Sequence, residues 1–144
     1  MSSYESFVET IHRMYQAWND GRMEDFYGFI AEDVVDYNAG DSEAGLAGVR
    51  AALGAVREGI PDLRYEVLAV AWDGTDLTAA RLGCSGTHLG DFFGDPPTGR
   101  RAEWTETRWA RWLDGKVVEH WANTDALTMM RQLGLIAPVT RDSW

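Results

Sequence analysis

The sequence predicts an α+β fold in which three N-terminal helices and a short C-terminal helix pack on a strongly curved, mostly antiparallel sheet, giving a cone-shaped barrel. Two observations support this prediction. Apolar residues recur with a helical period as far as Ile60, and with a period of two after Pro61. In addition, Asp73-Gly74 and Asp114-Gly115 each separate two alternating segments, which is the strongest short-range signal of a β-hairpin.

The half of the chain before Pro61 predicts three helices and one short strand. In the first and third helices, apolar residues recur three and four positions apart, as along one face of an α-helix. Asp20-Gly21 ends the first helix, and Pro61 closes the third. The expected elements are helices over residues 4–19, 23–30 and 46–60 and a strand over residues 34–37.

After Pro61 the pattern predicts four strands, paired as two hairpins, and a last helix that Gly134 ends. Loop 90–101 lies between the hairpins, is rich in Gly, Pro and Asp, and is long enough to be a lid or an interface. A curved sheet wrapped around a helix leaves a pocket at one end of the cone. The expected strands span residues 64–72, 77–88, 103–113 and 116–123, and the last helix spans residues 124–133.

The composition points to a small-molecule cavity rather than to a nucleic-acid or membrane partner. With 144 residues, of which 45% are hydrophobic, the chain can bury one core, so we expect a single domain over residues 1–144. Seven Trp, five Tyr and five Phe suit a cavity that holds a flat, hydrophobic molecule. The net charge, 13 − 23 = −10, disfavours nucleic acids and anionic membranes as partners.

Targeting, redox and metal-binding signals are missing from the sequence. The N-terminus has no basic region followed by an apolar one, and no apolar run approaches the roughly 20 residues of a membrane span, so we expect a cytoplasmic protein. Cys84, the only cysteine, is expected to be a small buried apolar residue. No two histidines have the spacing of ligands on one element, so we expect no metal site.

Six short motifs, spread over nearly the whole chain, occur in an order that matches a known family. They are Trp18-Asn19-Asp20-Gly21, Gly86-Thr87-His88-Leu89-Gly90, Gly94-Asp95-Pro96-Pro97-Thr98-Gly99-Arg100-Arg101, Asp114-Gly115-Lys116, Glu119-His120-Trp121 and Arg131-Gln132-Leu133-Gly134. With these motifs the chain resembles the SnoaL-like polyketide cyclases, which have the cone-shaped fold of the nuclear transport factor two-like superfamily. The same fold hosts several activities.

The resemblance implies a cofactor-free, cyclase-like or isomerase-like enzyme of secondary metabolism, such as antibiotic biosynthesis. Its substrate would be a hydrophobic, carbonyl-rich, polyketide-like molecule. The family's cyclases close a ring by intramolecular aldol chemistry, with an aspartate two residues after a strand histidine as the general acid/base. Here that position is Ala122, whose methyl group cannot transfer a proton. Two alternatives therefore stay open: a hydroxylase-like pathway member of the same fold, and a protein that binds such a molecule without catalysis.

Strand parity selects a first candidate for catalysis, because alternate residues of a strand share a face. Val118, His120 and Ala122 share one face, and the family's aspartate position implies that it is the cavity face. His120 is the candidate proton carrier, since imidazole titrates near neutral pH. The structural alternative is a histidine bonded to the neighbouring backbone.

Three further residues are catalytic candidates because the resemblance implies polar cavity residues at their positions. Glu106 and Arg108 share a face of one strand and could hold a carbonyl or enolate oxygen, or else form a structural ion pair at the open end of the sheet. Asp36 could replace the missing aspartate, or else be a surface carboxylate at a strand end.

Other residues are candidates for substrate contact or for assembly. His88 and Arg81 lie on opposite faces of a regular strand, so only one of them can face the cavity. Trp109 and Arg111 should lie on the outer face of the sheet, where an exposed Trp marks a contact surface. With the family's habit of dimerising there, we expect a homodimer or homotetramer. The candidate substrate contacts are Tyr15, Trp18, Tyr37, Tyr65, His88, Trp104 and Ala122.

Overall fold

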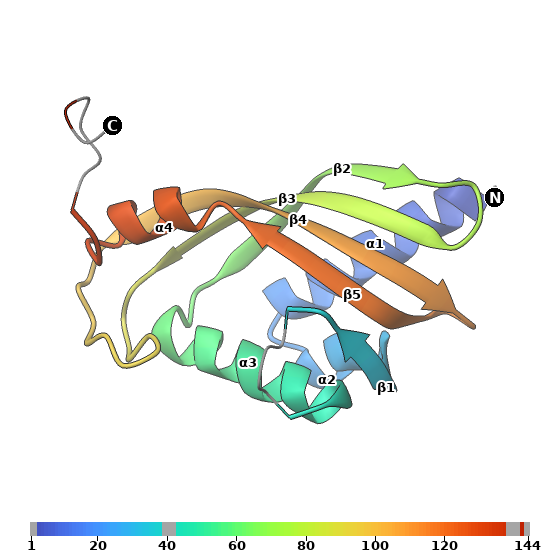
Figure 1. The fold of residues 1–144 in the computed structure, drawn as a ribbon, viewed down its shortest axis with the longest axis horizontal. Coiled ribbons are helices and arrows are strands. Elements are labelled where there is room, and N and C mark those ends of the chain that lie inside the picture. Colours follow the sequence, from blue (N-terminus) through green and yellow to red (C-terminus); the bar gives the residue numbers. More distant parts are fainter. Residues whose placement is uncertain (1–2, 39–42, 138–141, 143–144) are drawn as a thin grey trace.

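The computed structural model describes residues 3–38, 43–137 and 142, which form four helices and five strands (Figure 1). The helices are α1 (Ser3–Asn19), α2 (Met23–Tyr27), α3 (Gly45–Gly59) and α4 (Ala126–Gln132). The strands are β1 (Ile30–Asp36), β2 (Arg64–Trp72), β3 (Leu77–Thr87), β4 (Arg101–Leu113) and β5 (Lys116–Thr124). None of these helices is long and apolar enough to cross a membrane.

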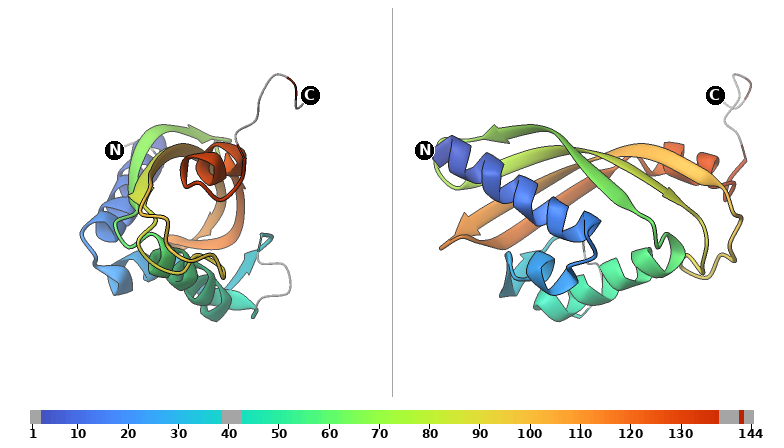
Figure 2. Two further views of the ribbon diagram at one scale, coloured as in Figure 1. Left: turned by 90° about the vertical axis from the view of Figure 1, so that its left-hand side faces the viewer. Right: turned by 180° about the vertical axis from the view of Figure 1, so that it is seen from behind.

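The strands form one mixed sheet in the order β1-β5-β4-β3-β2, in which β1 runs parallel to β5 and the other neighbours are antiparallel. Seen end-on, the sheet forms an arc with α1 and α3 on its open side (Figure 2). The predicted α+β class and the strongly curved, mostly antiparallel sheet are therefore confirmed. The sheet is curled rather than closed, because among the described residues no pairing joins the edge strands β1 and β2.

Both Asp-Gly pairs form the predicted hairpin turns. Between β4 and β5, Asp114 and Gly115 have φ angles of 51° and 77°, the left-handed conformation that a tight two-residue hairpin turn requires at both positions. Between β2 and β3, the carboxylate of Asp73 accepts hydrogen bonds from the backbone N–H groups of residues 75–77. These turns help to fix the strand registers, which decide which side chains face the concave side of the sheet.

Two adjacent residues at the end of α1 attach this helix to the edge strand β2. The side-chain amide of Asn19 donates to the carbonyl of Tyr65 (2.7 Å) and accepts from its N–H (2.9 Å). Trp18 donates from Nε1 to the carbonyl of Leu63 (2.9 Å), and its ring packs edge-on against Phe26 and Tyr65. The helix is thereby fixed across the open side of the arc.

The region around β1 differs from the sequence prediction. The helix α2 ends at Tyr27, and Ile30, predicted as the end of that helix, begins β1 and is aligned with Val117 of β5. The strand therefore spans residues 30–36 rather than 34–37. Its pairing partner is far away in the sequence, so the local spacing of apolar residues does not reveal it.

Candidate active site

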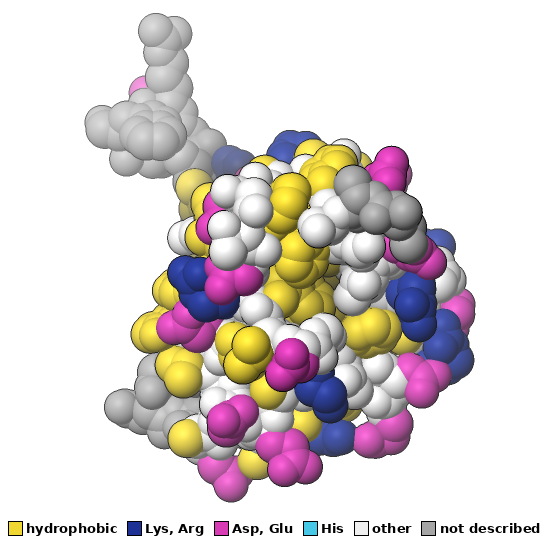
Figure 3. All heavy atoms as spheres, turned by 90° about the vertical axis from the view of Figure 1, so that its right-hand side faces the viewer, with side chains coloured by type: hydrophobic (Ala, Val, Ile, Leu, Met, Phe, Trp, Pro, Cys, Tyr) yellow, Lys and Arg dark blue, Asp and Glu magenta, His cyan; other side chains and the backbone are white. Residues whose placement is uncertain are grey.

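A cavity of about 480 Å³ lies between the concave face of the sheet and the helices α1 and α3. At the end of the molecule that carries the β4–β5 turn, apolar side chains gather in the centre of the surface and charged ones surround them (Figure 3). The size and the mostly apolar lining suit a small organic ligand. The apolar lining includes Ile11, Met14, Phe26, Val49, Leu53, Ala80, Trp112 and Val117, and the polar lining includes Asp36, Asn38, Glu106, Arg108, His120 and Thr124.

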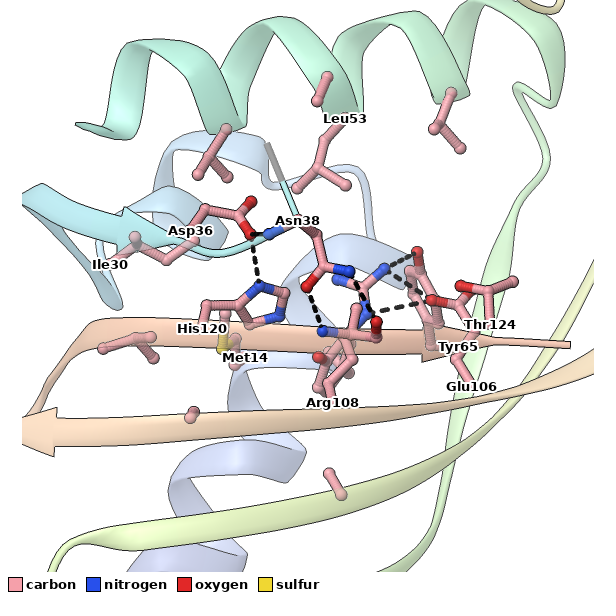
Figure 4. A pocket seen from close by; sticks show the side chains of 18 of the residues that line it. Met14, Ile30, Asp36, Asn38, Leu53, Tyr65, Glu106, Arg108, His120 and Thr124 are labelled. Atoms are coloured by element: carbon pink, nitrogen blue, oxygen red, sulfur yellow. Dashed lines mark hydrogen bonds and ion pairs between the residues drawn. The ribbon is translucent and has the colours of Figure 1, made fainter. Parts of the chain in front are cut away.

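Asp36 and His120 are aligned with each other across the β1–β5 pair and meet at the cavity wall (Figure 4). Nδ1 of His120 lies 3.4 Å from Oδ1 of Asp36, and the two side chains are 22% and 16% exposed, respectively. Burial alone would raise the pKa of Asp36. The hydrogen bonds from His120 and from the backbone N–H of Asn38, together with the charge of Arg108, lower it instead.

The ionised carboxylate fixes the tautomer of His120. Because a carboxylate can only accept hydrogen bonds, Nδ1 of His120 must carry a proton to bond to Asp36. In the neutral imidazole, Nε2 is then an acceptor, and it has no hydrogen-bond partner among the described residues. A ligand in the cavity therefore meets a base whose second nitrogen is already oriented.

Asn38 holds the chain beyond β1 against β5. Its Nδ2 donates to the carbonyl of Ala122 (2.7 Å), and its Oδ1 accepts from the N–H of the same residue. Its own backbone N–H donates to Oδ1 of Asp36 (2.9 Å). The side-chain amide thus imitates the backbone of a strand and keeps Asp36 beside His120. The sequence does not predict this role; an Asn two residues after a strand is its only signal.

Glu106 and Arg108 form a buried ion pair on the inner face of β4. Oε1 of Glu106 accepts from Nε and Nη2 of Arg108, at 3.2 and 3.0 Å. Its Oε2 accepts from Sγ of Cys84 (3.2 Å) and from Nε1 of Trp104 (3.1 Å). Nη2 of Arg108 also donates to the hydroxyl of Tyr65 (3.0 Å). Each carboxylate oxygen of Glu106 therefore already has two donors.

Both members of this pair stay charged. Burial would raise the pKa of Glu106, but Arg108 and the hydrogen bonds from Cys84 and Trp104 lower it. Burial would lower the pKa of Arg108, but Tyr65 and Glu106 hold it well above its usual value. Burial also raises the pKa of Tyr65, which remains a neutral phenol. Burial also raises the pKa of Tyr15, and the charge of Arg108 and a side-chain hydrogen bond to it oppose that rise. The charged guanidinium therefore faces two phenols at the cavity wall.

Most of the residues that the sequence singles out line this cavity. The structure brings together the four candidate catalytic residues and four of the candidate contacts, namely Asp36, Glu106, Arg108, His120, Tyr15, Tyr65, Trp104 and Ala122. Among the residues that the structure describes, no three His, Cys, Asp or Glu side chains are grouped as ligands of a metal ion would be.

Two predicted contact residues, Trp18 and Tyr37, lie outside this lining. Trp18 packs into the aromatic core under α1 and is only 3% exposed. Tyr37 lies on the outer side, because strand alternation turns it away once Asp36 points inward. It stacks on Trp121 with ring centroids 4.9 Å apart and donates to Glu119 (2.8 Å). Neither side chain therefore contributes to the wall of this cavity.

His88 also lies outside the lining, although strand parity does direct it inward. It follows the last residue of β3, where the next loop folds over it and leaves it fully buried. Its Nδ1 contacts the hydroxyl of Thr98 (3.1 Å), and Phe92 packs edge-on against its ring. Arg81, the alternative, is exposed on the other face. His88 is therefore kept out of the cavity lining by a loop whose position local sequence patterns do not predict.

Val118, predicted to share the cavity face with His120, is displaced by a β-bulge in β5. The register shifts opposite Arg111 and Trp112, so that Val117 turns inward and is only 3% exposed. Alternation then resumes and brings His120 to the cavity as predicted. Two adjacent valines give no signal of which one lies inside.

The sequence also misses two aromatic residues of the lining, Phe92 and Phe93. Both belong to the loop between β3 and β4, which has the composition of a turn rather than of a pocket wall. Their signal is the occurrence of two adjacent aromatic residues among Gly, Pro and Asp.

The fold and the cavity agree with the family that a comparison of the sequence finds. The family model described as SnoaL-like polyketide cyclase matches residues 9–133, which is most of the chain. The chain therefore belongs to the SnoaL-like polyketide cyclase family.

Particular relatives agree with this assignment. The chain is 28% identical, over 146 residues, to the aklanonic acid methyl ester cyclase DauD of Streptomyces sp. (strain C5), covering 95% of this chain and 86% of DauD. AclR of Streptomyces galilaeus, a proposed hydroxylase, superposes with a TM-score of 0.84 and 29% identity, covering 97% of this chain and 88% of AclR.

A further solved structure is similar to this chain. IdmH of Streptomyces antibioticus, a proposed polyketide cyclase, superposes with a TM-score of 0.76 and 35% identity, covering 88% of this chain and 97% of IdmH. Together these relatives support a polyketide cyclase-like role.

Proposed function

We propose that the protein is a cofactor-free, polyketide cyclase-like enzyme that closes a ring in a hydrophobic, carbonyl-rich molecule by intramolecular aldol chemistry. The observation that supports this most directly is the contact between His120 and Asp36, which leaves Nε2 of His120 for a ligand in a mostly apolar cavity. The cyclase names of relatives such as DauD point in the same direction.

In this proposal His120 takes a proton from one carbon of the substrate and returns it to an oxygen of the same molecule. Its Nε2 removes a proton from a carbon next to a carbonyl, and the resulting enolate carbon attacks a second carbonyl carbon of the same molecule. A C–H bond and a C=O π bond break, a C–C bond forms, and the new alkoxide takes the proton from Nε2. Asp36 stabilises the imidazolium between these steps.

Arg108 stabilises the oxygen on which negative charge develops. It is aligned with Ala122 and is thus diagonal to His120, and diagonal neighbours in a sheet are roughly 7–8 Å apart. The cation and the base can therefore contact different atoms of one small molecule. Glu106 orients Arg108 and carries no proton, because its oxygens are already occupied.

Turnover of aklanonic acid methyl ester, the compound in the name of DauD, tests the proposal. We expect the protein to convert it into a chromatographically distinct isomer of the same mass. The variant Ala122→Asp, which restores the family's acid beside His120, should increase the rate. An unchanged substrate with both proteins, despite tight binding, would contradict catalysis and favour the binding-protein alternative.

A hydroxylase-like activity is the second candidate, and the similarity to AclR together with Ala122 favours it. The same assay distinguishes the two candidates, because hydroxylation adds an oxygen atom and aldol closure leaves the mass unchanged. A product heavier by one oxygen would therefore replace the cyclase proposal.

A further inference from the structure

The loop between β3 and β4 contains a tight turn whose first central residue is a phenylalanine. Phe92 and Asp95 exchange two backbone hydrogen bonds, each 3.0 Å long, around Phe93 and Gly94. These two central residues have φ angles of 49° and 93°. Positive φ at both positions defines a turn that strongly prefers Asn, Asp or Gly at the first of them.

Neither backbone preference nor core packing accounts for Phe93 at this position. A bulky side chain in the left-handed region is strained, and such strain is found mainly where a function requires it. Burial does not compensate for it, because Phe93 is 64% exposed. Replacement by Asn would suit the backbone better and would leave no hole in the core.

The turn nevertheless places Phe93 at the cavity. Phe93 belongs to the lining, and its ring meets Phe92 edge-on with centroids 4.9 Å apart. Phe92 is only 6% exposed and packs so closely on Gly59 that a Cβ there would lie 2.6 Å from its ring. The carboxylate of Asp91 accepts from the N–H of Gly94 (3.1 Å). The anchored turn thus presents an exposed aromatic ring to whatever occupies this end of the cavity.

We propose that Phe93 is a specificity-determining residue that selects ligands by the length of their aromatic ring system. Phe93 lies beyond the end of β3, whereas Arg108 and His120 lie within β4 and β5. A short ligand held at Arg108 and His120 does not reach the turn, and a longer flat one stacks on Phe93. The inference rests on the proposed function only in taking this cavity as the ligand site, and it requires no chemistry there.

Three neutral phenols of increasing size test this selection: 1-naphthol, 9-phenanthrol and 1-hydroxypyrene. Trp104 and Trp112 line the cavity, so quenching of tryptophan fluorescence reports the binding of each probe. In Phe93→Asn we expect about 3- to 10-fold weaker binding of 1-hydroxypyrene, the size of one lost aromatic stacking contact, and unchanged binding of 1-naphthol. The Tm should rise by roughly 3 °C, because Asn suits the turn.

Leu89→Asn is the matched control, since Leu89 is 55% exposed near the same loop but does not belong to the cavity lining. It should leave the affinity for all three phenols unchanged. Equal affinities of wild type and Phe93→Asn would overturn the proposal, as would a lowered Tm with uniformly weakened binding, which would mark Phe93 as structural. If the wild type bound none of the phenols, this inference and the ligand site would fail together, whereas failure of aldol turnover alone would leave it standing.

Discussion

The cavity contains two pairs of potentially charged side chains, Glu106–Arg108 and Asp36–His120, and they differ in how completely their hydrogen-bonding atoms are used. Both oxygens of Glu106 accept from two donors each, and its side chain is only 7% exposed. In the Asp36–His120 pair, Oδ1 of Asp36 accepts from the N–H of Asn38 and contacts Nδ1 of His120 at the longer distance of 3.4 Å. Oδ2 of Asp36 and Nε2 of His120 have no hydrogen-bond partner among the described residues.

This difference separates a fixed charge from a proton carrier. Arginine does not lose its proton in proteins, and a carboxylate surrounded by donors has no acceptor position left for a substrate proton. Histidine changes charge near neutral pH, and Nε2 of His120 is unoccupied by the described residues. We infer that the cavity combines a permanent electrostatic site with a base whose free nitrogen is oriented by Asp36.

The largest effect should follow from breaking the Glu106–Arg108 pair, in which both carboxylate oxygens are fully hydrogen-bonded. Glu106→Gln leaves Arg108 as a buried, unpaired cation, so the free energy of unfolding should fall by about 3–5 kcal/mol in urea denaturation at pH 7. Glu119→Gln, which removes a carboxylate of a solvent-screened pair with Arg111, should cost much less. Equal losses in the two variants would contradict the assignment of Glu106–Arg108 as the structural pair.

The stability difference between wild type and Glu106→Gln should also depend on pH. The pKa of Glu106 is lowered by folding, so its stabilisation is fully present above the pKa of an unfolded Glu, about 4.3, and is lost as the pH falls through its lower folded value. The difference in unfolding free energy between wild type and Glu106→Gln should therefore shrink below pH ~4. A difference that grows on acidification would show that Glu106 is protonated in the folded protein.

A smaller effect should follow from removing the side chain of Asn38, which keeps Asp36 beside His120. Asn38→Ala removes both hydrogen bonds to Ala122, which should lower the free energy of unfolding by about 1 kcal/mol and release Asp36 from His120. Replacing Asp36 by Asn should then alter the NMR chemical shifts of the His120 ring less in the Asn38→Ala background than in wild type. Identical effects of Asp36→Asn in both backgrounds would exclude Asn38 as a positioning residue.

The smallest effect on the cavity should come from the outer face of the sheet, where we propose that two copies of the chain associate. Trp109 is 41% exposed there and is aligned with Trp121 on β5. Trp109→Glu should convert the assembly to a monomer in sedimentation velocity and leave probe binding in the cavity unchanged. A wild type that is already monomeric at working concentrations would end this proposal.

The parts of the fold that the sequence predicts are those that local rules determine. The Asp-Gly turns and the alternation along β4 place Glu106 and Arg108 on the inner face, because a regular strand preserves parity. Parity fails at Val118, where a bulge inserts an extra residue, and it cannot place His88 beneath a loop.

What the sequence does not predict depends on contacts between distant segments. The parallel pairing of β1 with β5 places Asp36 opposite His120, and the side chain of Asn38 extends that pairing beyond the end of the strand. No local periodicity records either contact. The candidate catalytic residues can thus be named from the sequence. The distances in the structure are needed to see that the hydrogen-bonding atoms of Glu106 are all occupied and that those of the Asp36–His120 pair are not.

Proton abstraction itself gives the most direct test of His120. The methyl protons of 2-acetylnaphthalene exchange slowly with D2O, and NMR can follow their loss in the presence of the protein. We expect the wild type and His12→Gln, a variant of an exposed histidine on α1, to accelerate this exchange equally. His120→Gln should lose about 100-fold or more of the protein-catalysed rate. Undiminished exchange in His120→Gln would contradict its role as the proton carrier.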